Sequence, residues 1–342
     1  MSKKIITENL PFVIAEIGHN HQGSVEKAME MIKQAKLCGA SAVKLQKRSN
    51  KNLYTKEMYN SIYNSENSYA KTYGEHRDFL EFDKKQYFDL KKFSEELDII
   101  FFSTPFDFES VEFLENINVP CYKIASADVT NTPLQEKIAE TGKPIILSTG
   151  ASSLDDVKRA HEVISKINEN LYILHCTASY PANIEDMNLN CIKTLIKTFP
   201  NNIIGLSDHE NGIDAASIAY MLGARIFEKH FTLNRSWKGT DQSFSLEPDG
   251  LRKLIRNLNR IPSMLGSNTK KILENEKAPI KKMAKSIVAA KEIDKDTIIK
   301  LEHLAFKSPG GGLRPYFRDQ VLGKKLKSKK NKDDLINFED IE

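Results

Sequence analysis

The chain has 342 residues, of which 40% are hydrophobic and 28% are charged, and its formal net charge is +4. This small basic excess, together with the lack of aromatic residues among the clustered lysines near the C-terminus, argues against nucleic-acid binding. The 4 cysteines form no CxxC pair, and no apolar run approaches the roughly 20 residues that span a bilayer, so we expect a cytoplasmic protein with no membrane partner.

Short β-rich runs alternate with amphipathic helical stretches along most of the chain. Helices are predicted at 24–39, 107–117, 152–167, 212–223 and 248–261. We predict eight strands, at 12–17, 41–46, 99–103, 120–124, 144–148, 171–175, 202–207 and 224–230. Eight β/α units in roughly 260 residues is the proportion of a TIM barrel. A doubly wound open sheet is the alternative, but the first strand is followed by GHNHQG and not by GxGxxG.

After the last predicted helix the pattern changes to short strands and a run of three glycines, Gly310–Gly312. We place a TIM-barrel catalytic domain at 1–262, a linker at 263–282 and a small β-rich domain at 283–342. The predicted fold class is therefore α/β, a (β/α)8 barrel followed by a small β-rich domain.

Polar residues end every predicted strand. The carboxyl ends of all eight barrel strands converge on one face, where active sites of this fold are built. Ser, Thr and Asp also favour turns and helix caps, but lysines, glutamates and histidines at strand ends are harder to explain that way. The residues that we expect at this face are Glu16, Lys44, Gln46, Ser103, Thr104, Lys123, Ser126, Asp128, Ser148, Thr149, His175, Thr177, Ser207, Asp208, His209, Glu228 and His230.

His209 and His230 end the adjacent seventh and eighth strands, so their imidazoles can share one divalent ion. Neutral imidazole suits Mn, Zn, Fe or Co, and two histidines leave positions for water and substrate oxygens. We expect Mn²⁺, with Mg²⁺ or Co²⁺ as alternatives. A single histidine at a strand end is more often a hydrogen-bonded structural residue.

Lys44 and Lys123 lie among strand-end hydroxyl groups, a combination that binds phosphate and carboxylate together. A lysine at this place can instead be a Schiff-base nucleophile, as in aldolases of the same fold. The residues alone leave both roles open, although the hydroxyl donors favour anion binding.

The chain contains, in order, the motifs AEIGHNHQG, AVKLQK, STPFD, YKIASADVTN, ILSTGAS, LHCTASYPA, IGLSDHENG, FEKHFTL and WKGTDQSFSLEP. This series resembles the N-acetylneuraminate (sialic acid) synthase family over nearly the whole chain, most specifically in SDH, KHFTL and KGTD. The C-terminal stretch KSIVAAKEIDKDTIIKLEHLAFKSPGGGL resembles the antifreeze-like (SAF) domain that follows the barrel in these enzymes.

The resemblance implies a transferase that condenses phosphoenolpyruvate with an acylated mannosamine-type sugar, giving a nine-carbon 2-keto acid and phosphate by C–O cleavage. It implies that His209 and His230 hold the metal, and that Glu16 or Asp128 activates water. The residues implied to bind phosphoenolpyruvate are Lys44, Thr104, Lys123, Ser126, Ser148 and Ser207. Those implied or suggested to face the sugar or its aldehyde are Glu16, Gln46, Tyr180, Asp241, Tyr73, Arg77 and Arg314. Arg314 is suggested as a substitute for an arginine that the family often has where this chain has Ser308.

The loops 71–82 and 237–248 resemble those of the members that include the animal 9-phosphate synthases. An inward-facing Arg77 would favour a 6-phosphorylated sugar, because a guanidinium forks onto phosphate oxygens. We expect instead a surface arginine paired with Glu75 or Asp78, and therefore unphosphorylated N-acetylmannosamine or a close relative. The 6-phosphate, or a precursor of legionaminic or pseudaminic acid, is the alternative.

The resemblance also implies a homodimer in which residues from about 283 onward reach over the partner's barrel. Two further hypotheses are a Schiff-base aldolase and a non-catalytic sugar-binding barrel. The sequence determines neither the exact sugar, nor the native metal, nor the downstream pathway.

Overall fold

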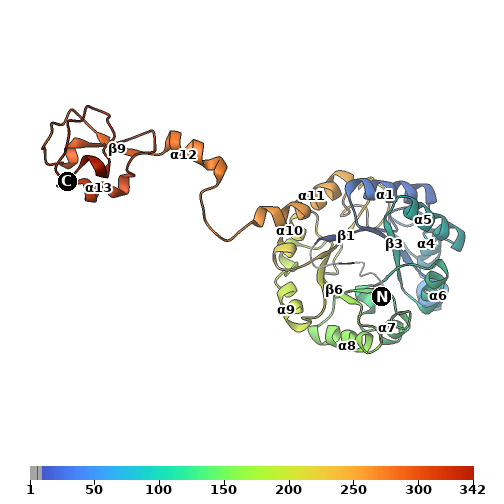
Figure 1. The fold of residues 1–342 in the computed structure, drawn as a ribbon. Coiled ribbons are helices and arrows are strands. Elements are labelled where there is room, and N and C mark those ends of the chain that lie inside the picture. Colours follow the sequence, from blue (N-terminus) through green and yellow to red (C-terminus); the bar gives the residue numbers. More distant parts are fainter. Residues whose placement is uncertain (1–5, 7–9) are drawn as a thin grey trace. The chain divides into compact units, whose positions relative to one another are not determined.

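The computed structural model describes residue 6 and residues 10–342, and the chain divides into two compact units, Met1–Leu265 and Gly266–Glu342. The first unit is a closed barrel in which each strand pairs in parallel with the next and β8 returns to β1 (Figure 1). The predicted TIM barrel is confirmed. Its strands are β1 (Phe12–Gly18), β2 (Ala42–Lys47), β3 (Ile100–Pro105), β4 (Tyr122–Ile124), β5 (Ile145–Ser148), β6 (Leu171–Cys176), β7 (Ile204–Asp208) and β8 (Ile226–His230).

Helices form the outer ring of the barrel (Figure 1). Within the described residues, no helix is long and apolar enough to cross a membrane. The helices of this unit are α1 (Val25–Cys38), α2 (Asn50–Leu53), α3 (Lys56–Asn60), α4 (Tyr73–Phe79), α5 (Lys84–Glu96), α6 (Phe108–Ile117), α7 (Thr132–Ala139), α8 (Leu154–Ser165), α9 (Cys191–Thr198), α10 (Asp214–Met221) and α11 (Pro248–Leu265), with the 3₁₀ helices η1 (Ser126–Asp128) and η2 (Ile184–Asp186).

Local sequence fixes where these helices begin and end. The hydroxyl of Ser24 accepts a hydrogen bond from the amide of Lys27 and so caps the first turn of α1. The same helix stops at Gly39, whose φ of 91° is in the left-handed region that glycine adopts at little cost. This turn returns the chain to the barrel wall, where β2 begins.

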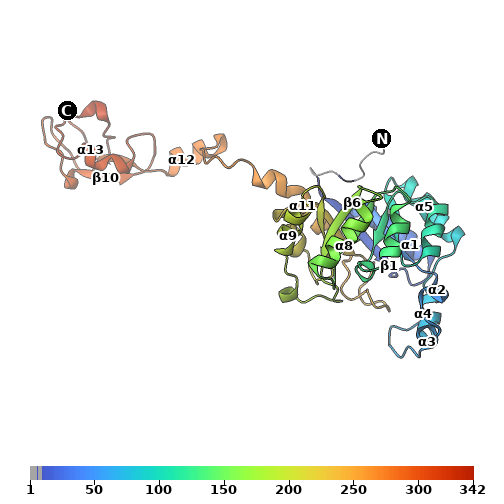
Figure 2. The same ribbon diagram turned by 90° about the horizontal axis from the view of Figure 1, so that it is seen from below.

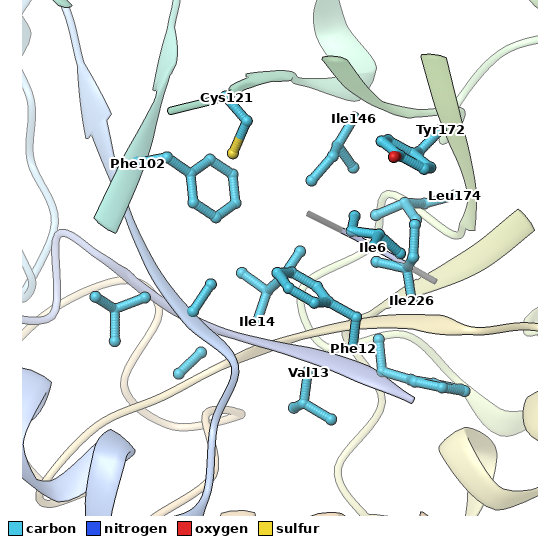
Figure 3. Close-up of a cluster of buried hydrophobic side chains, with 14 of the residues drawn as sticks. Ile6, Phe12, Val13, Ile14, Phe102, Cys121, Ile146, Tyr172, Leu174 and Ile226 are labelled. Atoms are coloured by element: carbon cyan, nitrogen blue, oxygen red, sulfur yellow. The ribbon is translucent and has the colours of Figure 1, made fainter. Parts of the chain in front are cut away.

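The interior of the barrel changes character along the strands. Near their amino ends, the inward-facing positions are apolar and pack into one cluster, which includes Ile6 (Figure 3). In the same view Phe12 and Ile14 point toward Phe102, while Val13 between them points away, as strand alternation requires. Further along the strands the inward positions become polar. A packed floor therefore supports a polar chamber at the carboxyl ends.

The longest connection between barrel strands lies between β2 and β3, and its first part folds into α2, α3 and α4. Figure 2 shows these three helices grouped beyond one end of the barrel. Because α2 follows the carboxyl end of β2, this is the end that carries the polar chamber.

The second unit has its own small apolar core, built around Ile287, Ile299, Leu326 and Ile336. Its strands β9 (Ser286–Ala289) and β10 (Leu304–Lys307) pair antiparallel. The segment that we expected to be a linker contains the end of α11, which continues to Leu265, and the helix α12. The remaining elements are α12 (Lys277–Met283), α13 (Arg318–Val321), η3 (Glu274–Glu276), η4 (Leu301–His303), η5 (Pro315–Phe317) and η6 (Phe338–Asp340).

Candidate active site

A cavity of about 550 Å³ occupies the carboxyl ends of the barrel strands. Strands β1 to β8 and the loops that follow them contribute its walls, which is the expected position of an active site in this fold. The site residues predicted from the sequence that line it are Glu16, Lys44, Gln46, Arg77, Thr104, Lys123, Ser126, Ser148, Tyr180, Ser207, His209, His230 and Asp241.

A buried ion pair forms one side of the chamber floor. The Nζ atom of Lys44 lies 2.7 Å from Oε2 of Glu16, and both side chains are almost completely buried. The same ammonium donates to the hydroxyl of Thr104 at 2.9 Å, and the amide of Gln46 donates to Glu16 at 2.7 Å. The lysine of β2 is therefore held in one orientation by groups from its two neighbouring strands, β1 and β3.

Glu228 links this pair to the second lysine. Its carboxylate lies 3.6 Å from Nζ of Lys123 and 4.0 Å from Nζ of Lys44, and it accepts a hydrogen bond from Ser207 at 3.1 Å. Lys123 also donates to Ser148 at 2.6 Å. The sequence placed Glu228 at a strand end but gave it no function. The sequence did contain a signal that Glu228 belongs to the site. It lies two residues before His230 on one strand, so both side chains must face the barrel interior.

The pKa values of these two carboxyl groups shift in opposite directions, although burial raises both. For Glu16, burial and the nearby Glu228 charge raise the pKa more than Lys44 lowers it. For Glu228, burial would raise the pKa, but the ammonium groups of Lys123 and Lys44 bring it down to about 2. Glu228 therefore stays ionised at neutral pH, whereas Glu16 is the carboxyl group that titrates closer to neutrality.

The two histidines meet as predicted, with ring centroids 5.3 Å apart. Nδ1 of His209 lies 2.9 Å from the carbonyl oxygen of Thr177, an arrangement in which Nδ1–H donates and Nε2 keeps its lone pair. Burial lowers the pKa of His209 to about 4 and also lowers that of His230. Both imidazoles are therefore neutral at pH 7 and chemically able to ligate a metal ion.

The histidine pair fits a divalent ion that is held mainly by water and substrate. The buried Nδ1 of His230 has no hydrogen-bond partner among the described residues and lies 3.8 Å from a carboxylate oxygen of Asp241. No group of three or more His, Cys, Asp or Glu side chains in the described part of the chain is arranged to hold a metal. Two imidazoles with open positions match a weakly held catalytic ion better than a closed structural site.

Two arginines, Arg48 and Arg77, also line the cavity, and the sequence analysis did not predict Arg48. Its guanidinium lies against the ring of Phe106, 3.8 Å from the ring centroid, and donates to Gln46 at 2.7 Å. Arg48 follows β2 directly, so its direction depends on the loop and not on strand alternation. No sequence pattern that we used could have found it.

Arg48 and Arg77 approach the same imidazole from opposite sides. Nη1 of Arg48 lies 3.1 Å from Nε2 of His19, and Nη1 of Arg77 lies 3.2 Å from Nδ1 of that ring. A neutral imidazole has one acceptor nitrogen and one N–H donor, so it can satisfy only one of these guanidinium groups. No carboxylate of residue 6 or residues 10–342 forms an ion pair with either arginine.

The structure does not show the pairing that we expected for Arg77. Helix α4 directs this side chain toward the cavity, where Tyr73 accepts hydrogen bonds from its Nε at 3.1 Å and Nη2 at 3.0 Å. Glu75 instead completes the capping box of α4, and Asp78 accepts hydrogen bonds from other side chains. The expectation of a surface arginine was therefore wrong.

The loops around 71–82 and 237–248 contact each other at the mouth of the cavity. The hydroxyl of Tyr69 donates to the carbonyl of Lys238 at 2.6 Å, and the amide of Gly239 donates to Asn67 at 3.0 Å. Thr240 and Asp241 from the second loop line the cavity. The two segments thus act as one wall.

Two barrel residues to which we gave a catalytic or sugar-binding role, Asp128 and Tyr73, do not line the cavity. Asp128 ends the 3₁₀ turn η1 and accepts a hydrogen bond from Asn131. The turn directs Ser126 toward the cavity, and Asp128, two residues later, is not among the lining residues. Tyr73 reaches the cavity only through Arg77. Arg314 belongs to the second unit, where it precedes η5, and its part in the site stays a prediction.

Comparison with known proteins agrees with this architecture. N-acetylneuraminate-9-phosphate synthase from Homo sapiens is 40% identical over 326 residues, which cover 95% of this chain and 91% of that protein. N,N'-diacetyllegionaminic acid synthase from Campylobacter jejuni is 35% identical over 333 residues, covering 95% and 98%. The crystal structure of N-acetylneuraminic acid (sialic acid) synthetase from Leptospira borgpetersenii, in complex with citrate, has a TM-score of 0.69 at 34% identity and covers 80% and 91%.

Family models divide the chain in the same way. The NeuB family model matches residues 31–270, and the SAF domain model matches residues 284–342. The resemblance that the sequence motifs carried is therefore confirmed, and this chain belongs to the NeuB family, with a SAF domain after its barrel.

Proposed function

We propose that this protein condenses phosphoenolpyruvate with an acylated mannosamine-type sugar and releases inorganic phosphate. The observation that supports this most is one cavity in which two buried ammonium groups, Lys44 and Lys123, lie beside two neutral imidazoles, His209 and His230. Ammonium groups attract the carboxylate and phosphate of phosphoenolpyruvate, and imidazoles suit a divalent ion. The names of the curated relatives, both synthases of nonulosonic acids or their phosphates, agree with this assignment.

In this proposal the floor of the chamber binds phosphoenolpyruvate. Lys123 and Ser148, already hydrogen-bonded to each other, present donors to one anionic group, and Lys44 and Thr104 present donors to another. Because these donors are fixed before the ligand arrives, little ordering free energy is needed on binding. Glu228 balances their charge when the site is free of substrate.

His209 and His230 would hold the divalent ion, for which we propose Mn²⁺, with Mg²⁺ or Co²⁺ as alternatives. Such an ion, when bound, polarises the sugar aldehyde and stabilises negative charge on its oxygen. Two features of the chain favour binding of this ion. The lowered pKa values keep both imidazoles neutral, and the carbonyl oxygen of Thr177 fixes the tautomer of His209.

Glu16 is the proposed general base. After C3 of phosphoenolpyruvate bonds to the aldehyde carbon, C2 is left cationic and accepts water, and the tetrahedral intermediate then loses phosphate as its C2–O bond breaks. A carboxylate whose pKa lies nearer neutrality is a better proton acceptor for that water than one held at low pKa. The raised pKa of Glu16 favours it over Glu228, and we give Asp128 no part in this reaction.

For the sugar we propose the 6-phosphate in preference to unphosphorylated N-acetylmannosamine. Arg48 and Arg77 share one imidazole that can satisfy only one of them, and a phosphate dianion would accept hydrogen bonds from both. Identity of 40% to an N-acetylneuraminate-9-phosphate synthase supports the same choice. Precursors of legionaminic or pseudaminic acid are the competing substrates.

One experiment tests the reaction class. Phosphate release is measured with phosphoenolpyruvate and a panel of N-acetylmannosamine, its 6-phosphate and the diamino sugars that precede legionaminic and pseudaminic acid. With ¹⁸O in the bridging position of phosphoenolpyruvate, C–O cleavage delivers the label to inorganic phosphate. Label retained in the keto acid, or no release with any sugar, would reject the proposal.

A Schiff-base aldolase is the second candidate, because burial lowers the pKa of Lys123 and a neutral amine is the nucleophile in that chemistry. The ion pair with Glu228 opposes it, since this carboxylate favours the charged lysine. Borohydride in the presence of pyruvate would trap an aldolase and leave the proposed synthase unmodified. A sugar-binding barrel without activity would show neither result.

We also propose that the chain forms a cytoplasmic homodimer in which the SAF domain completes the partner's site. This proposal rests on the family resemblance. The physical reason for such a cover is that a reactive cation must be shielded from water at the open mouth of a barrel. Sedimentation of the full chain as a monomer during turnover would contradict it.

A further inference from the structure

A second buried ion pair lies directly behind the two histidines. Lys229 and Asp208 are 2% and 3% exposed, and Nζ of the lysine is 2.7 Å from Oδ2 of the aspartate. The two residues face each other in the register of β7 and β8. Each is the residue immediately before a histidine of the proposed metal pair, His209 or His230.

Strand alternation places this ion pair on the outer surface of the barrel wall. Glu228 and His230 line the cavity, so Lys229 between them points to the opposite face. Ser207 and His209 also line it, so Asp208 between them does the same. The outer pair and the inner histidines are thus attached to the same two short stretches of backbone. A shift that separates Lys229 from Asp208 also changes the spacing of the two imidazoles.

The lysine also holds the backbone on the far side of His209. Its ammonium donates to the carbonyl oxygen of Glu210, and the amide of Glu210 donates to Oδ1 of Asp208 at 2.9 Å. The residues before and after His209 are therefore both fastened to one ammonium group. This happens where β7 ends and where the strand ladder can no longer fix the chain.

Stability alone does not explain such a pair. Burying two charges costs several kcal/mol per ion in desolvation, and well-packed apolar residues of similar volume are often equally stable or more so. A buried pair does supply a fixed geometry, because each partner has only one place where its charge is satisfied.

We propose that the Lys229–Asp208 ion pair is a positioning device that holds His209 and His230 at the spacing required to bind a divalent ion. This inference rests on the metal assignment of the proposed function. Neither residue lines the cavity, so both would act through the histidines. Contacts behind metal ligands of this kind typically govern metal affinity by 10- to 100-fold.

The test compares the full-length parent with the double variant Lys229→Met/Asp208→Leu, which removes both charges while approximating their volume. The Mn²⁺ dissociation constant is measured without substrate, from the electron paramagnetic resonance signal of free Mn²⁺. Phosphoenolpyruvate affinity and the thermal midpoint are measured on the same samples. We expect Mn²⁺ binding about 10-fold weaker or worse, with phosphoenolpyruvate affinity and the thermal midpoint close to those of the parent.

A milder variant and a control keep the test decisive if the double variant folds poorly. Asp208→Asn keeps an acceptor for the amide of Glu210 and should give an intermediate loss of Mn²⁺ affinity. Lys143→Met breaks an ion pair with Glu115 elsewhere on the barrel and should leave Mn²⁺ binding unchanged. Parent-like Mn²⁺ affinity in a folded variant at Asp208 or Lys229 overturns this inference alone. A parent that binds no Mn²⁺ overturns the metal assignment and this inference with it.

Discussion

Lys44 and Glu16 form a buried contact of 2.7 Å at the floor of the cavity, and neither side chain exceeds 3% exposure. Glu16 is on β1 and Lys44 is on β2, and the parallel register of the two strands places these residues opposite each other. Removing one partner would leave the other charge buried and unpaired, and in the proposed reaction the contact also orients the ammonium group for a substrate anion. These two effects can be separated by mutation.

Lys44→Met should lower the free energy of unfolding by about 3–5 kcal/mol, because it leaves Glu16 buried without its partner. It should also weaken phosphoenolpyruvate binding by at least about tenfold, since a charged donor is lost. Calorimetric titration with phosphoenolpyruvate and chemical denaturation measure the two quantities.

The double variant Lys44→Met/Glu16→Gln is the matched control for Lys44→Met. It removes the unpaired charge and should recover much of the lost stability without recovering phosphoenolpyruvate affinity. Recovery of both would mean that the lysine acts on structure alone.

His209→Ala should reduce kcat by orders of magnitude, because in the proposed mechanism the sugar aldehyde then loses its polarising ion. Chelator treatment of the parent should have the same effect, and added Mn²⁺ should reverse it in the parent but not in the variant. Steady-state phosphate release is the assay. Activity that survives both treatments would remove the metal from the mechanism.

Arg77→Ala should abolish the proposed preference for a 6-phosphorylated sugar. A charge-assisted hydrogen bond contributes about 1.5–3 kcal/mol, so kcat/KM for the phosphorylated sugar should fall roughly 10- to 150-fold, while the value for N-acetylmannosamine changes little. Tyr73→Phe should reproduce part of the effect, because Tyr73 accepts two hydrogen bonds from this guanidinium. An equal loss on both sugars would assign Arg77 to the loop structure and not to specificity.

His21 should make the barrel sensitive to acid. Burial lowers its pKa from 6.5 to about 3, so the unfolded chain binds a proton that the folded chain excludes. Stability that is present above pH 6.5 is therefore lost as the pH falls toward 3, at up to about 1.4 kcal/mol per pH unit from this group.

His21→Asn is the variant that checks this effect. Asn retains an acceptor for the amide of Gly23, which donates to Nδ1 of His21 at 3.0 Å, but it does not titrate. Unfolding free energies of parent and variant between pH 7 and 5 should converge as the pH falls. Parallel curves would show that His21 is not the titrating group.

The sequence alone determined the barrel and the residues at the ends of its strands. Alternation and short β-rich runs located β1 to β8, and a strand that ends in a parallel barrel must present its last inward residue to the common face. Lys44, Lys123, His209 and His230 followed from that rule. The family and its SAF domain followed from the order of the motifs.

Only the tertiary structure decided two things. One is the direction of side chains in the loops that follow the strands, and the other is which side chains of neighbouring strands contact each other. Arg48 and Arg77 face the cavity and Asp128 does not, because loops and short helices set those directions and carry no periodicity. The bridge from Glu228 to both lysines, and the outer pair of Lys229 and Asp208, required the register between strands. Periodicity along one strand fixes the face that a side chain occupies, whereas its partner is fixed by the neighbouring strand that folding brings beside it.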